Sequence, residues 1–144
     1  MKVSTILATK GNKLITIASE QSVREAVSLF VQHNIGALVV LNREGAIEGI
    51  ISERDVVRQL GDNDDTLSLA VDRLMTSPVI TCLPQDDVMS VASVMTERRF
   101  RHLPVVEDGA LLGIISIGDV LKAQRDSYRG QIDTLETQIL ATED

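Results

Sequence analysis

Aromatic side chains are almost missing from this 144-residue sequence, which has no Trp, one Tyr and two Phe. The core must therefore consist of Val, Ile, Leu, Ala and Met, and recognition of a base by stacking on aromatic rings is not expected. Basic residues are also scarce, because 14 Lys and Arg stand against 21 Asp and Glu, for a net charge of −7. Proteins bind nucleic acids largely through Lys and Arg that neutralise phosphates, so this balance argues against a nucleic-acid partner.

The single cysteine, Cys82, excludes an intrachain disulfide and is typical of a reducing compartment. No apolar run approaches the roughly 18 residues of a membrane span, and residues 1–11 do not resemble a signal peptide. We therefore expect a cytoplasmic protein without a membrane partner. His33, Asp64 and Cys82 lack a metal-ligand spacing, and no cationic neighbour in the sequence activates Cys82 as a nucleophile.

The sequence contains an internal repeat. At a shift of 64 residues, the segments 49–52 and 55–56 (GIIS and DV) recur as 113–116 and 119–120. Each copy shows a short β-branched strand, a helix with apolar residues at helical spacing, two apolar strands around a Gly-containing turn, and a second helix. One such unit of about 50 residues has too little core to be stable alone, which favours two copies packed together.

The predicted elements follow from this pattern. Strands are expected at 14–17, 37–41, 46–51 and 79–82, and helices begin at Val23 and Val88. An acidic tip at 62–65 precedes a short helix predicted over Leu67–Met75, which ends before Pro78. The domain boundaries are predicted as repeat 1 at 1–62, a connecting helix and linker at 63–78, repeat 2 at 79–125 and a helical tail at 126–144.

The duplicated endings 49–55 and 113–119, together with the strand at 101–106 (RHLPVV), resemble a cystathionine-β-synthase (CBS) domain pair over about residues 1–125. The resemblance implies an α/β (α+β) fold in which two β-α-β-β-α repeats pack sheet to sheet with pseudo-twofold symmetry, followed here by a C-terminal helix. It further implies two clefts that hold AMP, ADP, ATP, NAD(H) or S-adenosylmethionine, and a regulatory rather than an enzymatic role.

Ser52 and Ser116 each stand at a predicted strand-to-helix junction, with Asp55 and Asp119 three residues later. The hydroxyl lies beside free N–H groups at the positive end of the helix dipole, where a phosphate can bind. The acid lies one turn further on and can accept hydrogen bonds from ribose hydroxyls. The same Ser-x-x-acid pattern is also a helix cap that needs no ligand. Both interpretations stay open, and they are compatible.

In the family, each cleft takes its serine and acid from one repeat and its base-lining residues from the other. The densest basic patch of the chain, 98–102, makes Arg101 and His102 candidates for phosphate contact as well. Repeat 1 has Gly36 and Ala37 at the corresponding places, so the two clefts are not equivalent. One predicted cleft combines Ser116, Asp119 and Ile114 with Lys13, Ile15, Gly36 and Ala37; the other combines Ser52, Asp55 and Ile50 with Pro78, Ile80, Arg101 and His102.

Beyond repeat 2, apolar residues at 121, 128, 132, 135 and 139 form a short stripe like that of a coiled coil. The stripe can pack on its own module or on a second subunit. Because CBS pairs commonly form twofold dimers, we predict a homodimer that this helix supports. The functional hypothesis is an adenine-nucleotide sensor, for example of energy state, that regulates an unidentified protein. The alternative is a partner-binding regulator with ligand-free, structural clefts, as similarity to plant CBS pairs that act on thioredoxins implies.

Overall fold

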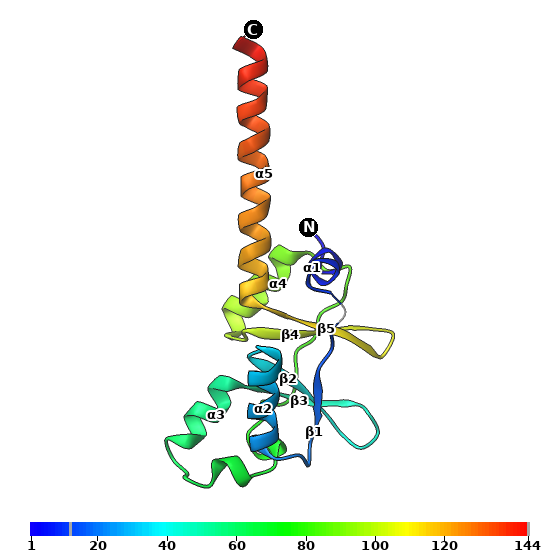
Figure 1. Ribbon diagram of the computed structural model, residues 1–144. Coiled ribbons are helices and arrows are strands. Elements are labelled where there is room, and N and C mark those ends of the chain that lie inside the picture. The colour runs from blue at the N-terminus through cyan, green and yellow to red at the C-terminus, as the bar shows by residue number, and fades with distance from the viewer. Residues whose placement is uncertain (12, 144) are drawn as a thin grey trace. The chain divides into compact units, whose positions relative to one another are not determined.

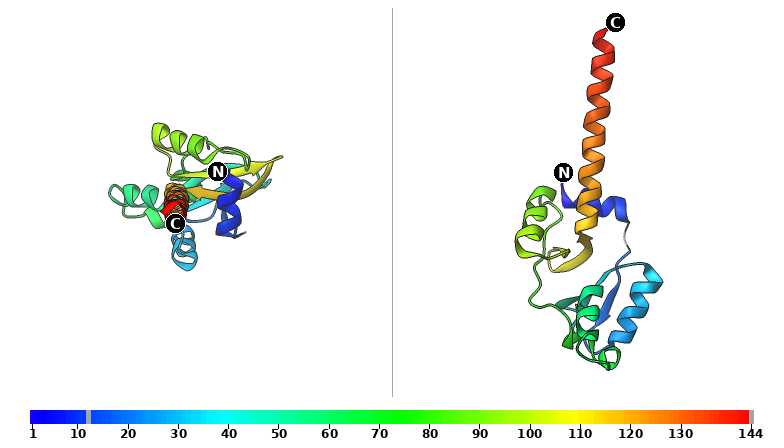
Figure 2. Two further views of the ribbon diagram at one scale, coloured as in Figure 1. Left: turned by 90° about the horizontal axis from the view of Figure 1, so that it is seen from above. Right: turned by 90° about the vertical axis from the view of Figure 1, so that its left-hand side faces the viewer.

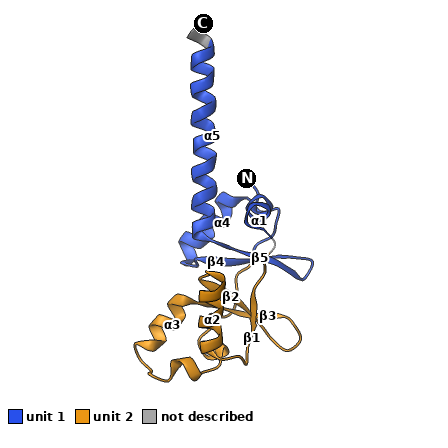
Figure 3. Ribbon diagram, viewed as in Figure 1, with its two compact units in different colours: residues 1–12, 82–144 blue, residues 13–81 orange. Residues whose placement is uncertain are grey.

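The computed structural model describes residues 1–11 and 13–143, with helices and strands mixed as the sequence predicted. The chain divides into two compact units, which Figure 3 distinguishes by colour. Unit 1 takes the N-terminal residues together with everything from Cys82 onward, and unit 2 spans Lys13–Thr81. The first predicted repeat therefore lies mainly in unit 2 and the second in unit 1.

Unit 2 is built on a three-stranded sheet (Figure 1). Its elements are β1 (Thr16–Ala18), α2 (Val23–His33), β2 (Ala37–Leu41), β3 (Ile47–Ser52), α3 (Glu53–Leu60) and two 3₁₀ turns, η1 (Thr66–Ser68) and η2 (Val71–Arg73). The strand order is β1-β2-β3, with β1 parallel to β2 and β2 antiparallel to β3. Gly45 in the β2–β3 turn has a φ of 81°, a left-handed conformation that glycine adopts without strain.

The apolar face of α2 supplies much of the core of unit 2. Val23, Ala26 and Phe30 recur at helical spacing, and all three are buried, as predicted. They belong to one apolar cluster with strand residues that include Leu38 and Ile51. The burial of these aliphatic side chains, rather than of aromatic rings, stabilises the unit.

Unit 1 contains a two-stranded antiparallel sheet and three helices. Its elements are α1 (Val3–Lys10), α4 (Val88–Arg98), β4 (His102–Glu107), β5 (Ala110–Ser116) and α5 (Ile117–Glu143). α5 is one uninterrupted helix of 27 residues, so the second helix of repeat 2 and the predicted tail are a single element (Figure 2). Val88, Val91 and Met95 of α4 are buried, as their spacing predicted.

The strand predicted at 79–82 was wrong in extent, because only Cys82 pairs with the sheet. Cys82 N–H donates to Pro104 O at 3.0 Å, and Cys82 O accepts from Val106 N–H at 2.9 Å. In unit 2 the ladder continues with a bond from Ser19 N–H to Leu41 O at 2.9 Å. The counterpart of Ser19 is Pro84, which has no N–H to donate, so the pairing ends earlier.

The helix predicted over Leu67–Met75 was also wrong, since η1 and η2 stand there instead. The backbone of this segment pairs with the loop before α2. Val23 N–H donates to Leu69 O, and Val71 N–H donates to Gln21 O, each at 2.8 Å. These long-range bonds use the groups that a continuous α-helix would need for its own i to i−4 bonds.

The N-terminal segment makes the same contacts in unit 1. Val88 N–H donates to Met1 O, and Val3 N–H donates to Asp86 O, each at 2.9 Å. Residues 1–7 and 69–75 are therefore equivalent segments, although the second was predicted as a connection. The N-terminal segment, which the predicted boundaries group with repeat 1, lies in the unit that contains the rest of repeat 2.

Candidate functional site

The first candidate junction lies in unit 2, where β3 ends and α3 begins. Asp55 N–H donates to Ser52 Oγ at 3.3 Å, and Asp55 Oδ2 accepts from Ser52 N–H at 2.9 Å and from Ser52 Oγ at 3.1 Å. This reciprocal pair is a capping box, so the capping interpretation of the Ser-x-x-Asp pattern is confirmed here. Both side chains are partly buried, which leaves part of each accessible.

The second junction lies in unit 1, between β5 and α5, and repeats this geometry. Asp119 N–H donates to Ser116 Oγ at 3.1 Å, and Ser116 N–H donates to Asp119 Oδ2 at 2.8 Å. The equivalent side chains of the two repeats therefore hold equivalent positions, as the internal repeat predicted.

Lys10 distinguishes the second junction from the first. Its ammonium, at the C-terminal end of α1, lies 2.8 Å from Asp119 Oδ2 and 2.8 Å from Ile114 O. In unit 2 the carbonyl of Ile50, the counterpart of Ile114, accepts instead from Thr76 N–H at 2.8 Å. A lysine side chain thus takes the place of a backbone amide and brings a positive charge to the carboxylate.

The sequence reasoning missed Lys10. Comparison of the two repeats does not reveal it, because the equivalent segment of the other repeat has no lysine at that place. Its partner Asp119 is also 109 residues away in the sequence. The only local signal is a lysine at the end of a short helix, which is usually explained by the helix dipole.

The pKa of Asp119 lies below its ordinary value of 3.8. Partial burial acts to raise this pKa, but the hydrogen bonds from Lys10 and Ser116 and the charge of Lys10 outweigh it. Asp119 is therefore an anion at neutral pH and acts only as a hydrogen-bond acceptor.

Four of the other predicted residues lie beside these junctions within their own unit. Ala37 is paired with Ser52 in the sheet, and His102 is paired with Ser116. The first amides of the two helices are also held here: Glu53 N–H donates to Gly36 O at 3.0 Å, and Ile117 N–H donates to Arg101 O at 2.9 Å. Gly36, Ala37, Arg101 and His102 thus lie beside the serine of their own unit.

The predicted clefts each draw residues from both units, and their composition stays a prediction. Unit 1 contains Ser116, Asp119, Ile114, Arg101 and His102, and unit 2 contains Ser52, Asp55, Ile50, Lys13, Ile15, Gly36, Ala37, Pro78 and Ile80.

Partly exposed apolar residues adjoin both junctions. Ile50 and Ile114 are partly exposed, whereas their neighbours Ile51 and Ile115 are fully buried. Successive residues of a strand point to opposite faces, so Ile50 and Ile114 point away from the face that carries Ile51 and Ile115. They offer an aliphatic surface close to each serine and acid. Three other predicted residues, Lys13, Pro78 and Arg101, are exposed.

Cys82 is buried, and its environment suppresses its reactivity. Burial, with a smaller contribution from the charge of Asp86, raises the pKa of the Cys82 thiol to about 11. A thiol with this pKa is almost fully protonated at neutral pH and is a poor nucleophile. Among residues 1–11 and 13–143, no three His, Cys, Asp or Glu side chains gather in a way that could hold a metal ion. None of the described helices combines the length and apolarity that crossing a membrane requires.

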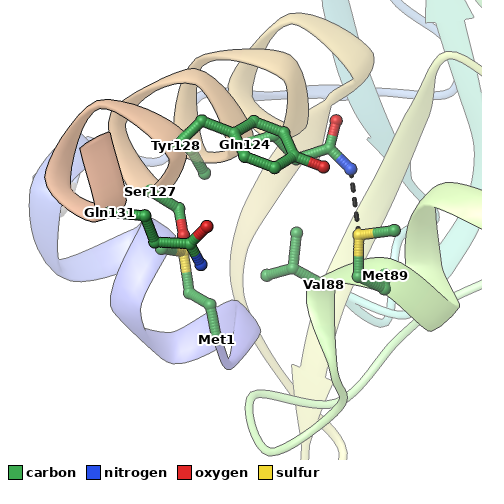
Figure 4. A pocket seen from close by; sticks show the side chains of 8 residues that line it. Met1, Val88, Met89, Gln124, Ser127, Tyr128 and Gln131 are labelled. Carbon is green, nitrogen blue, oxygen red and sulfur yellow. Dashed lines mark hydrogen bonds between the residues drawn. The ribbon is translucent and has the colours of Figure 1, made fainter. Parts of the chain in front are cut away.

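A separate hollow of about 180 Å³ lies in unit 1 between α4, α5 and the N-terminus (Figure 4). Gln124 Nε2 lies 2.9 Å from Met89 Sδ across it. None of its lining residues has a charged side chain, but Met1 carries the N-terminal ammonium, which lies 3.6 Å from Asp87 Oδ1. Its lining residues are Met1, Val88, Met89, Ala123, Gln124, Ser127, Tyr128 and Gln131.

Comparison with known proteins identifies relatives of the whole chain. The protein named "CBS domain-containing protein CBSX3, mitochondrial" from Arabidopsis thaliana is 33% identical over 146 aligned residues, which cover 95% of this chain and 71% of that protein. A crystal structure of a CBS-domain containing protein from Agrobacterium tumefaciens has a TM-score of 0.82 and 38% identity, covering 86% of this chain and 99% of that one.

A third relative was solved with ligands. The CBS domain pair of protein MJ0100, in complex with 5′-methylthioadenosine and S-adenosyl-L-methionine, has a TM-score of 0.79 and 28% identity, covering 88% of this chain and 98% of that one.

The model of the CBS domain family matches this chain twice, over residues 3–62 and 71–126. The two matches begin at Val3 and Val71, which make equivalent backbone hydrogen bonds in the two units. With two family matches, duplicated junctions and relatives over most of its length, this chain belongs to the CBS domain family and carries a pair of CBS repeats.

Proposed function

We propose that this chain is a non-catalytic regulatory module that binds an adenosine-containing ligand at its Ser-Asp junctions. The observation that carries the proposal is the duplicated geometry: each junction offers a serine hydroxyl, a carboxylate one turn along the helix and a partly exposed isoleucine on the adjoining strand. The MJ0100 pair, a relative of similar fold, binds two adenosine derivatives. AMP, ADP, ATP, NAD(H) and S-adenosylmethionine are the candidate ligands.

The chemistry of each junction matches one part of such a ligand. The carboxylates of Asp55 and Asp119 would accept hydrogen bonds from the ribose hydroxyls. The serine hydroxyls, which lie at the positive ends of the α3 and α5 dipoles, would contact a phosphate. For the base, we keep the predicted lining by Lys13, Ile15, Gly36 and Ala37 at one cleft, and by Pro78, Ile80, Arg101 and His102 at the other.

Lys10 leads us to expect different ligands at the two junctions. Its ammonium forms an ion pair with Asp119, whereas Asp55 forms no ion pair with any of the described residues. A cation beside the carboxylate would offset the charge of a phosphate at the Ser116 junction. We expect that junction to favour phosphorylated ligands such as AMP over adenosine.

Calorimetric titration tests the proposal directly. The six ligands AMP, ADP, ATP, NAD, NADH and S-adenosylmethionine are titrated into the wild type, Asp55→Asn and Asp119→Asn, with the exposed Asp133→Asn as the matched control. We expect at least one ligand to bind below millimolar, and one of the two junction variants to lose at least about 10-fold in affinity, the worth of one charge-assisted hydrogen bond. Binding that survives both junction substitutions, or no binding by any ligand, would contradict the proposal.

One observation favours a second candidate function, a partner-binding regulator with structural clefts. Both carboxylates already accept hydrogen bonds within the chain, and Asp119 also has an ion pair. The carboxylates at both junctions thus have hydrogen-bond donors without a ligand. If the titrations show no binding, proteins captured by the wild-type chain become the decisive data, because this second function requires a protein partner.

A further inference from the structure

The α5 helix carries a row of largely exposed apolar side chains. The side chains of the α5 stripe, defined here as Leu121, Tyr128, Ile132, Leu135 and Ile139, are between 53% and 63% exposed. In Figures 1 and 2 no other element of unit 1 lies beside the second half of this helix. Tyr128 lines the hollow of unit 1, but the stripe as a whole stays more than half exposed, so packing on its own module, one of the two predicted outcomes, covers it only in part.

One residue in the middle of α5 lowers the stability of this helix on its own. Gly130 lies near its middle, and glycine in a helix interior is destabilising relative to alanine. In proteins, most of the stability of a helix comes from packing of its apolar face rather than from helix propensity. A partner along the stripe would supply that packing.

The spacing of the stripe defines heptad positions. Tyr128 and Leu135 occupy d positions, and Ile132 and Ile139 occupy a positions, which is the 4-3 alternation of a coiled coil. From this spacing, and from the charges described in the next two paragraphs, we infer that α5 pairs with α5 of a second copy of this chain. The two helices run antiparallel. This inference goes beyond the proposed ligand binding and does not depend on it.

Arg125 argues against the parallel arrangement. It occupies the a position before Ile132, and in a parallel pair the two Arg125 side chains would meet in one layer of the seam. Like charges in such a layer repel each other. In the antiparallel register described below, the two Arg125 side chains lie about 25 Å apart along the axis at 1.5 Å per residue.

The charges beside the seam favour the antiparallel arrangement. Arg129 and Glu136 occupy successive e positions, and e positions face each other across an antiparallel pair. Each Arg129 then faces Glu136 of the second copy, which gives two ion pairs related by the twofold axis. The same register brings Gln131 opposite Gln138, whose amides can pair. In a parallel pair Gln131 would face Glu136, and neither ion pair would form.

This register also matches the apolar layers. Ile132 is opposite Leu135 of the second copy, and Tyr128 is opposite Ile139 of the second copy. Each of these layers occurs twice because of the twofold symmetry, so four consecutive apolar layers form the seam. The interface is isologous and closes on itself, which limits the assembly to a dimer.

The oligomeric state of the full chain is the first test. By size-exclusion chromatography with light scattering at tens of micromolar, we expect a dimer for the wild type and for Thr134→Glu, whose side chain lies off the seam. Leu135→Glu places a charge in two apolar layers and should raise the dimer dissociation constant more than about 100-fold, giving a monomer. A monomeric wild type, or a dimer that Leu135→Glu leaves intact, overturns the inference.

The helix direction is the second test, and disulfide trapping in a Cys82→Ala background decides it. Tyr128→Cys and Ile139→Cys proteins are oxidised separately and after mixing and exchange. Antiparallel pairing predicts cross-linking in the mixture only, because positions 128 and 139 face each other across the seam. Cross-linking of each variant alone, as efficient as in the mixture, would show a parallel pair and overturn the assigned direction.

Charge reversal gives an independent readout of the same register. Arg129→Glu and Glu136→Arg should each weaken the dimer by roughly 5-fold or more, since each replaces two ion pairs with two repulsive contacts. The double variant should recover the wild-type dissociation constant. Additive weakening in the double variant would contradict the pairing of these two positions.

Discussion

Removal of the Lys10 ammonium should destabilise unit 1 in a way that depends on pH. Lys10→Met keeps the length and the apolar stem of the side chain but deletes both hydrogen bonds of the ammonium, to Asp119 and to the carbonyl of Ile114. The carboxylate of Asp119 keeps its bond from Ser116 N–H, so the helix cap at the start of α5 should survive.

The magnitude follows from the exposure of the pair. The side chains of Lys10 and Asp119 are 36% and 21% exposed, so solvent screens the ion pair only in part. Exposed ion pairs contribute below about 1 kcal/mol, and hydrogen bonds to charged groups contribute about 1.5 to 3 kcal/mol. After allowance for screening, we expect Lys10→Met to lower the free energy of unfolding at pH 7 by about 1 kcal/mol.

The sign of the pH dependence follows from the lowered pKa of Asp119. A carboxyl group whose pKa is lower in the folded than in the unfolded state stabilises the fold above its unfolded pKa, and this contribution is lost as the pH falls through the folded pKa. Lys10 is one cause of the lowering. The stability difference between wild type and Lys10→Met should therefore be full at pH 7 and shrink below a pH of about 4, the unfolded value.

Urea denaturation followed by circular dichroism at several pH values measures this difference. Lys2→Met serves as the control, since Lys2 is an exposed lysine at the other end of the same helix and should show little change at any pH. Equal effects of Lys10→Met at pH 7 and pH 3 would refute the reasoning, because a loss without pH dependence would not involve the charge of Asp119.

Two further predictions concern packing around equivalent positions and the buried thiol. Gly49→Ala should destabilise unit 2 by about 1 to 3 kcal/mol, because the added Cβ would lie 2.5 Å from Met75 Sδ and 2.9 Å from the carbonyl oxygen of Thr76. Gly113→Ala should lower the free energy of unfolding by less, because its Cβ would lie 2.9 Å from only the flexible end of the Leu7 side chain. Urea titration measures both variants, and an equal loss of stability in the two would contradict this reasoning. Burial raises the pKa of the Cys82 thiol to about 11, so the native protein at pH 8 should react with a thiol reagent far more slowly than urea-unfolded protein. Similar reaction rates would show that the native thiol is accessible and ionised.

Local patterns in the sequence determined the elements whose interactions are also local. The helical spacing of Val23, Ala26 and Phe30 determined α2, and the apolar run from Ala37 to Leu41 determined β2 with the observed bounds. The Ser-x-x-Asp pattern determined both helix starts, because a capping box needs only four consecutive residues. The duplication of these patterns was enough to reach the family and the position of both junctions.

Only the tertiary structure decided which residues far apart in the sequence form hydrogen bonds or ion pairs with one another. The backbone around Val71 pairs with Gln21, and this pairing replaced the helix that local spacing predicted. Lys10 meets Asp119 across 109 positions, and no local preference encodes that contact. Propensity and periodicity act over a few residues, whereas such contacts arise when packing of the whole unit brings two backbones or charges together.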